Sequence, residues 1–292
     1  MSTQQCKLCL HRKLAILWIF FSGAIVSSSV VKTSGQSDFQ NSDDGTYIMR
    51  SYFDNYENLD DSSFENFMAH ELSSGLCRIT PENQNRGVRL SALELFLVGE
   101  GSHRQLSVYQ IADWGRSIPE LPSHICEVIV IQRLPLGVFA DPFELQNLQK
   151  PMEIAVFGDT KLELPSFRSN RSVVEVHIDV ASDILFMQNN GMEINILLPL
   201  HARYQPLNES GYSIVEIGEP DMFMRCSMEG KQSCLLMSLE DSAKSRISTV
   251  KWKIPAGIKA HTGFVPVGTF ITASLSTVLI VYASMFWSGT KT

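Results

Sequence analysis

The sequence predicts an all-β protein, an antiparallel two-sheet sandwich followed by one C-terminal transmembrane α-helix. Short apolar runs separated by turn residues fill residues 76–255, and the run at 173–180 alternates almost perfectly between apolar and polar side chains. Near the end of the chain, residues 264–287 carry no charge. Alternation of period two is typical of a strand with one buried face, and about 20 apolar residues in a helix cross a bilayer core of roughly 30 Å.

The run at 173–180 carries the clearest strand signal. Its alternating side chains are Val174, Glu175, Val176, His177, Ile178, Asp179 and Val180. We expect the apolar set to face the core and the polar set, His177 included, to lie on a solvated face. A metal or acid–base role for His177 would need convergent partners that sequence alone cannot show.

Further β-rich runs indicate more strands. They cover residues 93–98, 105–111, 127–131, 152–157, 192–198, 212–217, 235–239 and 249–254. Residues 141–150, rich in Leu and Gln, are the best candidate for a short helix. Several short strands at this spacing, with no long helices between them, favour a sandwich domain over residues 76–255.

The two ends of the chain predict its topology. Basic residues, an apolar stretch at 14–26 and small residues at 27–29 follow the order of a secretory signal, so residues 1–29 are expected to be a signal peptide or an uncleaved signal anchor. Residues 264–287 are expected to span a membrane and 288–292 to form a cytosolic tail. The alternatives for 264–287 are a buried core helix and a removable attachment signal for a glycosylphosphatidylinositol (GPI) anchor. Whether the signal is cleaved or kept as an anchor, we expect the middle of the chain to lie in the lumen.

Residues 30–75 are rich in acidic side chains, and the whole chain has a net charge of −7. Their aromatic residues follow no clean strand or helix period. We expect a flexible, disordered acidic linker, with a short binding segment as the alternative. Because no strongly basic stripe is present, nucleic acid is not an expected partner.

Four of the six cysteines lie in the expected lumenal part, where disulfides form. Cys226 and Cys234 bracket a turn, so we expect them to pair across a hairpin and leave Cys77 to pair with Cys126. Free buried thiols are the alternative. Asn170 and Asn208 each begin an Asn-x-Ser sequon in a polar turn and are candidate glycosylation sites.

The sequence carries no motif for catalysis. Gly99-Glu-Gly101 lacks the third glycine of a dinucleotide fingerprint and favours a hairpin turn. Nucleophile-elbow, zinc-protease and phosphate-loop patterns are absent, and His103, His124, His177 and His201 are widely scattered. We therefore expect no catalytic residues, no cofactor and no metal site.

Four segments, in order, resemble one family. Leu134-Pro-Leu-Gly-Val-Phe-Ala-Asp-Pro-Phe-Glu-Leu145 is similar to the Leu-Pro-x-Gly-x-Phe-x-Asp-x-Tyr/Phe-Glu-Leu signature of the PIG-X family. Residues 101–106 resemble its Gly-x-His-Arg-x-Leu, 198–206 its Leu-Pro-x-His-x-Arg-Tyr-x-x-Pro, and 252–257 its Pro-x-Gly entry to the membrane. One departure is Phe143, where tyrosine is commoner.

The resemblance implies a non-catalytic role. PIG-X proteins are endoplasmic-reticulum glycoproteins that stabilise the multi-span catalytic subunit of the first mannosyltransferase in GPI-anchor synthesis. The chain would then work in a hetero-oligomer in that membrane, with no small-molecule substrate of its own. The competing class is a single-span cell-surface adhesion or receptor protein with a β-sandwich.

The signature segment is a candidate contact surface for such a partner. The residues expected to form it are Leu134, Pro135, Gly137, Phe139, Asp141 and Phe143. Ordinary core packing of the same loop is the alternative. Small residues between Gly268 and Ser284 would let the expected span approach a partner helix closely.

Overall fold

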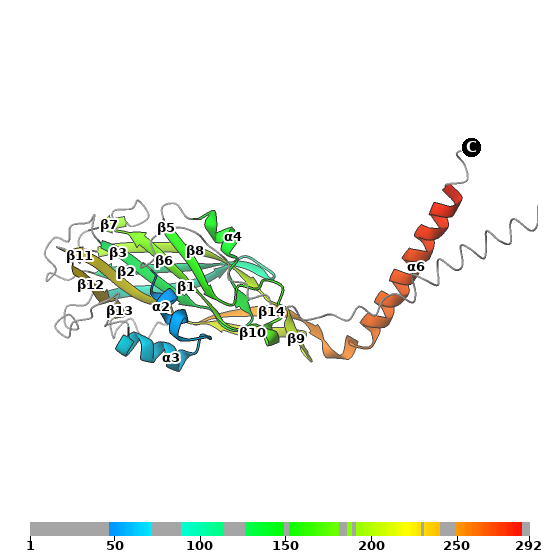
Figure 1. The fold of residues 1–292 in the computed structure, drawn as a ribbon, viewed down its shortest axis with the longest axis horizontal. Helices are drawn as coiled ribbons and strands as arrows, with labels where there is room; N and C mark the ends of the chain where they lie inside the picture. The colour runs from blue at the N-terminus through cyan, green and yellow to red at the C-terminus, as the bar shows by residue number, and fades with distance from the viewer. Residues whose placement is uncertain are drawn as a thin grey trace, which may run out of the picture. The chain divides into compact units, whose positions relative to one another are not determined.

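The computed structural model describes residues 47–71, 89–113, 126–148, 152–180, 186–188, 191–228, 231–239 and 249–287. Within them the chain is mostly antiparallel β-sheet, which confirms the predicted all-β class (Figure 1). The expected signal segment at 1–29 and tail at 288–292 lie outside the described residues, so the structure does not test them.

Three sheets build the sandwich. The first has the order β13-β1-β2-β8-β4, with β7 also paired to β8. Its strands are β1 (Arg89–Val98), β2 (His103–Asp113), β4 (Val138–Phe139), β7 (Phe186–Gln188), β8 (Gly191–Ala202) and β13 (Ser238–Leu239). The second has the order β12-β11-β3-β6-β5. Its strands are β3 (Cys126–Arg133), β5 (Met152–Gly158), β6 (Ser172–Asp179), β11 (Asp221–Met228) and β12 (Lys231–Leu236).

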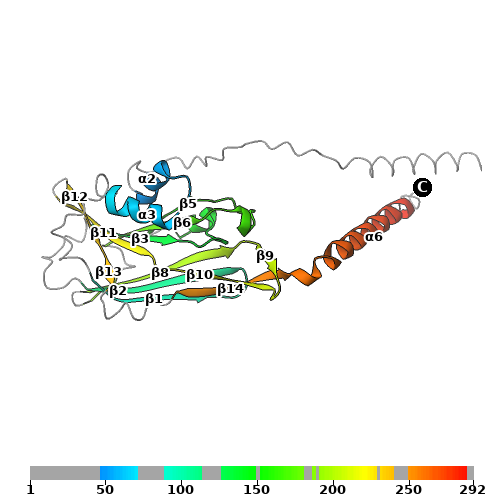
Figure 2. The same cartoon turned by 90° about the horizontal axis from the view of Figure 1, so that it is seen from below.

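A smaller sheet, β10-β14-β9, continues the layer of the first sheet beside β1 (Figure 2). Its strands are β9 (Gln205–Asn208), β10 (Tyr212–Ile217) and β14 (Val250–Ile258). All described pairings are antiparallel except β1 with β13 and β9 with β14. The main core fills the space between the layers, and its largest fully buried side chain is Trp252 of β14.

A layer of helices covers the outer face of the second sheet (Figure 2). It consists of α2 (Ile48–Asn55), α3 (Asp61–Asn66) and a π-helical turn at Phe67–Glu71. Ile48, Met49, Tyr52, Phe64 and Phe67 are buried against side chains of the sheet that include Ile129, Ile131, Val173 and Phe223. The expected disordered linker is therefore wrong for residues 47–71. The acidic residues from Asp54 to Glu65 are exposed, whereas the aromatic side chains of Tyr52, Phe64 and Phe67 are buried against the sheet.

This helical layer also changes the environment of β6. Glu175 and His177, expected on a solvated face, are buried. The alternation of residues 173–180 is real, but a sheet covered on both sides buries both sets of side chains. The prediction of a solvated face was wrong because the layer that covers it comes from residues more than a hundred positions earlier.

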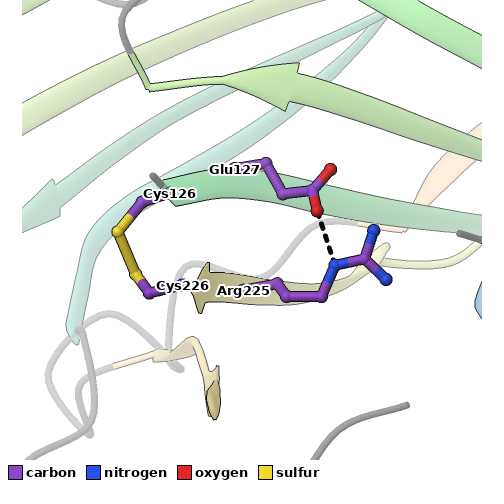
Figure 3. Close-up of a disulfide and its surroundings, with 4 residues drawn as sticks. All are labelled: Cys126, Glu127, Arg225 and Cys226. Atoms are coloured by element: carbon purple, nitrogen blue, oxygen red, sulfur yellow. Dashed lines mark hydrogen bonds and ion pairs between the residues drawn. A yellow bond between two sulfur atoms is a disulfide. The ribbon is translucent and has the colours of Figure 1, made fainter. Parts of the chain in front are cut away.

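The disulfide joins Cys126 to Cys226, with Cα atoms 4.1 Å apart (Figure 3). These residues are direct neighbours in the register of β3 and β11. Both expected pairings are wrong, since each used one of these two cysteines. In the β11–β12 hairpin, Cys234 is opposite Arg225, one position away from Cys226. Cys77 lies outside the described residues.

Three short helices and one long one complete the fold. The expected helix at 141–150 is present as α4 (Pro142–Gln146), whose N-cap Asp141 accepts a hydrogen bond from the Phe143 backbone N–H at 2.9 Å. Single 3₁₀ turns, η4 (Ser166–Arg168) and η5 (Lys259–His261), follow β5 and β14. The chain then forms α6 (Phe264–Trp287), which is long and apolar enough to cross a membrane, as expected.

Candidate functional site

The four segments singled out in the sequence meet at one end of the sandwich. We call this the junction end, because β14 leaves it towards α6; it comprises residues 101–104, 136–144, 201–208 and 252–258. The Ala202 N–H donates to the Ser102 carbonyl at 2.7 Å, and the Arg203 N–H donates to the Gly137 carbonyl at 2.8 Å. The indole N–H of Trp252 donates to the Gly101 carbonyl at 3.2 Å. Segments up to 151 positions apart are thus bonded directly to one another.

A stack of planar groups crosses three strands at the junction end. His103 of β2 and Phe139 of β4 are both opposite His201 of β8. The His103 and His201 rings stack with centroids 4.4 Å apart, and Phe139 stacks on the other side of His201 at 5.2 Å. The guanidinium of Arg203 lies 4.6 Å from the Phe139 ring centroid. This row fixes the orientation of both histidines.

Glu144 of α4 joins the two histidines. Its Oε1 lies 3.2 Å from His103 Nε2, and its Oε2 lies 2.7 Å from His201 Nε2. Asp141 caps the helix that carries Glu144, so the Asp-x-x-Glu spacing of the signature places a carboxylate over the histidine pair. The sequence showed these three residues in three motifs but could not show that they converge. The expectation of scattered histidines is wrong for this pair.

Arg203 fixes the loop that follows β5. Its buried guanidinium donates to the carbonyl oxygens of Leu164 and Asp159, each at 3.1 Å, and also to that of Lys161. Burial lowers the pKa of Arg203, and the nearby Asp159 carboxylate opposes that effect. The two neighbouring residues therefore differ: Arg203 is buried and holds the loop, whereas the side chain of Tyr204 is exposed.

The signature loop is part core and part surface. Leu134 and Gly137 are buried, Phe139 is nearly so, and Pro135 and Asp141 are half-buried. Gly137 has φ of +89°, and a Cβ there would lie 2.5 Å from Gln205 Nε2. Of the six candidate contact residues, Phe143 alone is exposed. Its neighbour in the loop, Leu136, is also exposed.

More apolar side chains are exposed at and beside the junction end than the sequence indicated. We call this group the apolar rim; its members are Leu136, Phe167, Tyr204, Leu207 and Ile258. The segments that carry them touch, since the Ser166 N–H donates to the Tyr204 carbonyl at 2.9 Å and β9 pairs with β14. Phe167 and Leu207 had no signal in the sequence. Tyr204 belongs to a recognised motif and could have been proposed.

A second polar cluster lies under the helical layer. His177 Nδ1 lies 2.9 Å from Glu127 Oε2, and Nε2 lies 2.9 Å from Glu175 Oε1. Arg225 also pairs with Glu127 (Figure 3). Burial alone would lower the pKa of His177, but hydrogen bonds to the two carboxylates outweigh it and raise the pKa to about 9. The cluster is buried and holds α2, so its chemistry is structural.

The two glycosylation candidates differ in their surroundings. Asn170 is exposed, and its backbone N–H donates to Asp159 Oδ2 at 2.9 Å. The Asn208 side chain closes a turn at the junction end: Oδ1 accepts from the Gly211 N–H at 2.7 Å, and Nδ2 donates to the Tyr212 carbonyl at 2.5 Å. Asn170 is therefore the freer acceptor.

Comparison with known sequences identifies the family. The family described as PIG-X / PBN1 matches residues 99–285, which include all four segments of the junction end. The chain belongs to the PIG-X/PBN1 family. A human PIG-X relative, named as the stabilizing subunit of GPI alpha-1,4-mannosyltransferase I, is 25% identical over 229 residues, covering 70% of this chain and 85% of the relative. The rat protein of the same name is 27% identical over 222 residues, covering 68% and 84%.

The PBN1 branch matches a shorter part of the chain. The protein named pbn1 of Schizosaccharomyces pombe is 28% identical over 117 residues, which cover 38% of this chain and 35% of the relative. The PIG-X relatives support an accessory role in GPI-anchor biosynthesis for this family member.

Proposed function

We propose that the chain is the non-catalytic stabilising subunit of GPI mannosyltransferase I in the endoplasmic-reticulum membrane. In this role it binds the multi-span catalytic subunit that adds the first mannose to the GPI precursor. The names of the mammalian relatives support membership in a mannosyltransferase complex. The exposed apolar rim at the junction end is the observation that points to the surface that binds the catalytic subunit. Binding only the folded form of the partner would stabilise it by mass action.

The position of the rim in the chain supports contact close to the membrane. Residues 259–263 alone separate β14 from α6. Fully extended, a segment of that length reaches no more than about 20 Å. With α6 as a span, the end of β14 at Ile258 stays within that distance of the bilayer surface, and β9 pairs with this end through Asn208. A membrane-embedded partner can then meet the rim and α6 together.

The signature loop enters this proposal in a revised form. Leu136 and Phe143 present apolar surface, whereas Leu134, Gly137 and Phe139 pack inside the domain. We assign the contact to the first two together with the rim. Pro135 and Asp141 shape the loop: the Val138 N–H donates to the Pro135 carbonyl at 3.1 Å, and Asp141 caps α4.

The span offers a second contact. The hydroxyl groups of Thr269, Thr272, Ser276 and Thr277 each donate to the carbonyl four residues earlier, at 2.8–2.9 Å. Their polar atoms are thus satisfied within α6, as a lipid environment requires. Small side chains of this kind let a partner helix approach closely.

Co-purification from microsomes in mild detergent tests the proposal. The tagged chain should recover a mannosyltransferase subunit in stoichiometric amount. Replacing Leu136 and Tyr204 together by Asp should reduce that recovery and the level of GPI-anchored proteins. Leu197→Asp is the matched control, since Leu197 is a comparably exposed apolar residue in the middle of β8. Recovery of the chain alone, or with surface proteins, would contradict the proposed function.

A further inference from the structure

We propose that His103, Glu144 and His201 form a binding site for a divalent transition-metal ion, with Zn²⁺ as the best-suited ion. The proposal depends only on the geometry of the chain and not on the identity of its partner. The three residues come from β2, α4 and β8, and one donor atom from each lies within 4.8 Å of the other two. Within the described residues, this is the group of histidines and carboxylates that converges in this way.

The ligand types suit zinc. Two imidazoles and one carboxylate form the three-ligand set that zinc uses when a fourth position is left to water. Imidazole nitrogen also favours zinc over magnesium or calcium, which prefer sites made entirely of oxygen ligands. Both imidazoles here direct Nε2 towards Glu144, and each nitrogen meets a different carboxylate oxygen.

The donor atoms lie closer together than in a loaded site. Donors bound about 2.1 Å from a tetrahedral ion are roughly 3.4 Å apart. The two separations between histidine and glutamate are 3.2 and 2.7 Å. Small rotations of the His103 and Glu144 side chains would open the space for an ion, and both are partly exposed, at 52% and 34%. An ion and its water ligand can therefore reach the site from solvent.

The surroundings hold the ligands in place. His201 is fixed between the rings of His103 and Phe139, and the guanidinium of Arg203 packs on the Phe139 ring. The Asp141 cap orients the first turn of α4 and with it Glu144. Such support of metal ligands by neighbouring groups is typical of built sites. An ion bound here would join three chain segments at the junction end and stabilise the folded state.

Zinc content and binding by the full-length chain test the proposal. The chain is purified in detergent through a histidine-free tag, stripped with a chelator, and titrated with Zn²⁺ alone in a calorimeter. We expect about one equivalent to bind through this cluster and thermal unfolding to shift upwards by several degrees. Glu144→Gln and His103→Gln should each weaken that binding by at least about tenfold and remove the shift.

The choice of variants separates a metal ligand from a hydrogen-bonding partner. Glu144→Gln keeps one acceptor oxygen for the histidine N–H groups but is a poor zinc ligand. His261→Gln, an exposed histidine of η5 outside the cluster, is the matched control and should bind zinc as the wild type does. The proposal is overturned if the wild type binds no zinc, or if Glu144→Gln and His103→Gln bind it with unchanged affinity and stoichiometry. The second outcome would place the metal on other residues.

Discussion

The carboxylate of Glu175 closes the N-terminus of the helix that begins at Ile48, 127 positions earlier in the chain. Oε1 accepts the Ile48 N–H and Oε2 accepts the Met49 N–H, both at 2.8 Å. A carboxylate at this position satisfies two N–H groups that have no partner within the helix and complements the helix dipole. The same carboxylate binds His177, so one buried residue joins the helical layer to the sheet.

Removal of this carboxylate should release α2 from the sheet. Glu175→Ala leaves two helix N–H groups and Nε2 of the buried His177 without their acceptor, at a cost of about 3–5 kcal/mol in the free energy of unfolding. Glu175→Gln keeps one acceptor oxygen and should cost less. The check is hydrogen exchange of the α2 amides together with thermal unfolding. Glu163→Ala, at an exposed glutamate, serves as the control. Full protection of the α2 amides in Glu175→Ala would contradict the assigned role.

Stability should fall at alkaline pH because of His177. Its pKa is about 9 in the folded protein, above the ordinary value of 6.5 that an unfolded chain has. Its stabilising contribution is therefore complete below pH 6.5 and is lost as the pH rises towards 9, with an upper limit of about 3 kcal/mol. The unfolding temperature measured across this window should decrease. In His177→Asn the slope over the same window should flatten; an unchanged slope would exclude His177 as the cause.

The disulfide should appear as a Cys126–Cys226 bond in non-reduced peptide maps. Cys226→Ser should remove the bond and lower stability by about 2–5 kcal/mol, because the bond joins residues 100 positions apart in the chain. Cys234→Ser should leave the bond in place. Detection of a Cys226–Cys234 peptide in the wild-type protein would contradict the structure.

A side chain at Gly137 should destabilise the domain. A Cβ at this position would lie 2.5 Å from Gln205 Nε2 and 3.2 Å from Ser166 Cβ, and the residue has a left-handed φ. Gly137→Ala should lower stability by roughly 1–3 kcal/mol beyond Gly101→Ala, because the added Cβ must displace the Gln205 amide and crowds Ser166. Gly101 is the matched control, because its φ is +76° and no atom lies within 4 Å of a Cβ there. Equal losses in the two variants would show that the backbone conformation, and not the contact with β9, sets the cost.

Substitution of the two sequon asparagines should have different effects. Asn170→Gln should remove one glycan step on a gel and leave the unfolding temperature nearly unchanged, since the side chain is exposed. Asn208→Gln should lower stability, because its amide closes the turn that ends at Tyr212. Loss of stability in Asn170→Gln alone would contradict this assignment.

Local patterns in the sequence predicted much of the fold. The alternation of apolar residues located the strand at Tyr212–Ile217 with its observed bounds and gave the centres of most others. The uncharged run predicted α6, and the stretch rich in Leu and Gln at 141–150 predicted α4, which is shorter than expected. Each of these features depends on neighbours within about ten residues, which a single sequence displays.

The errors arose where distant segments meet. The acidic composition of residues 47–71 concealed apolar residues that are buried by β3 and β6, and that same contact buries His177. The disulfide depends on the register of β3 against β11, which no local pattern reveals. The histidine cluster likewise depends on β2, β8 and α4 meeting at one end of the sandwich. The family motifs indicated the correct segments without showing their geometry.

The contact between Glu175 and α2 also has a consequence for the order of assembly. A growing chain lengthens at about 5–20 residues per second, so the 127 positions between Ile48 and Glu175 take roughly 6–25 seconds to make. For that time the apolar face of α2 has no sheet to cover it, and Cys126 waits roughly 5–20 seconds for Cys226, which is made 100 positions later. The first described helix to be synthesised can thus dock only after β6 has been made, and a chaperone that shields Ile48, Met49 and Tyr52 would act within that interval.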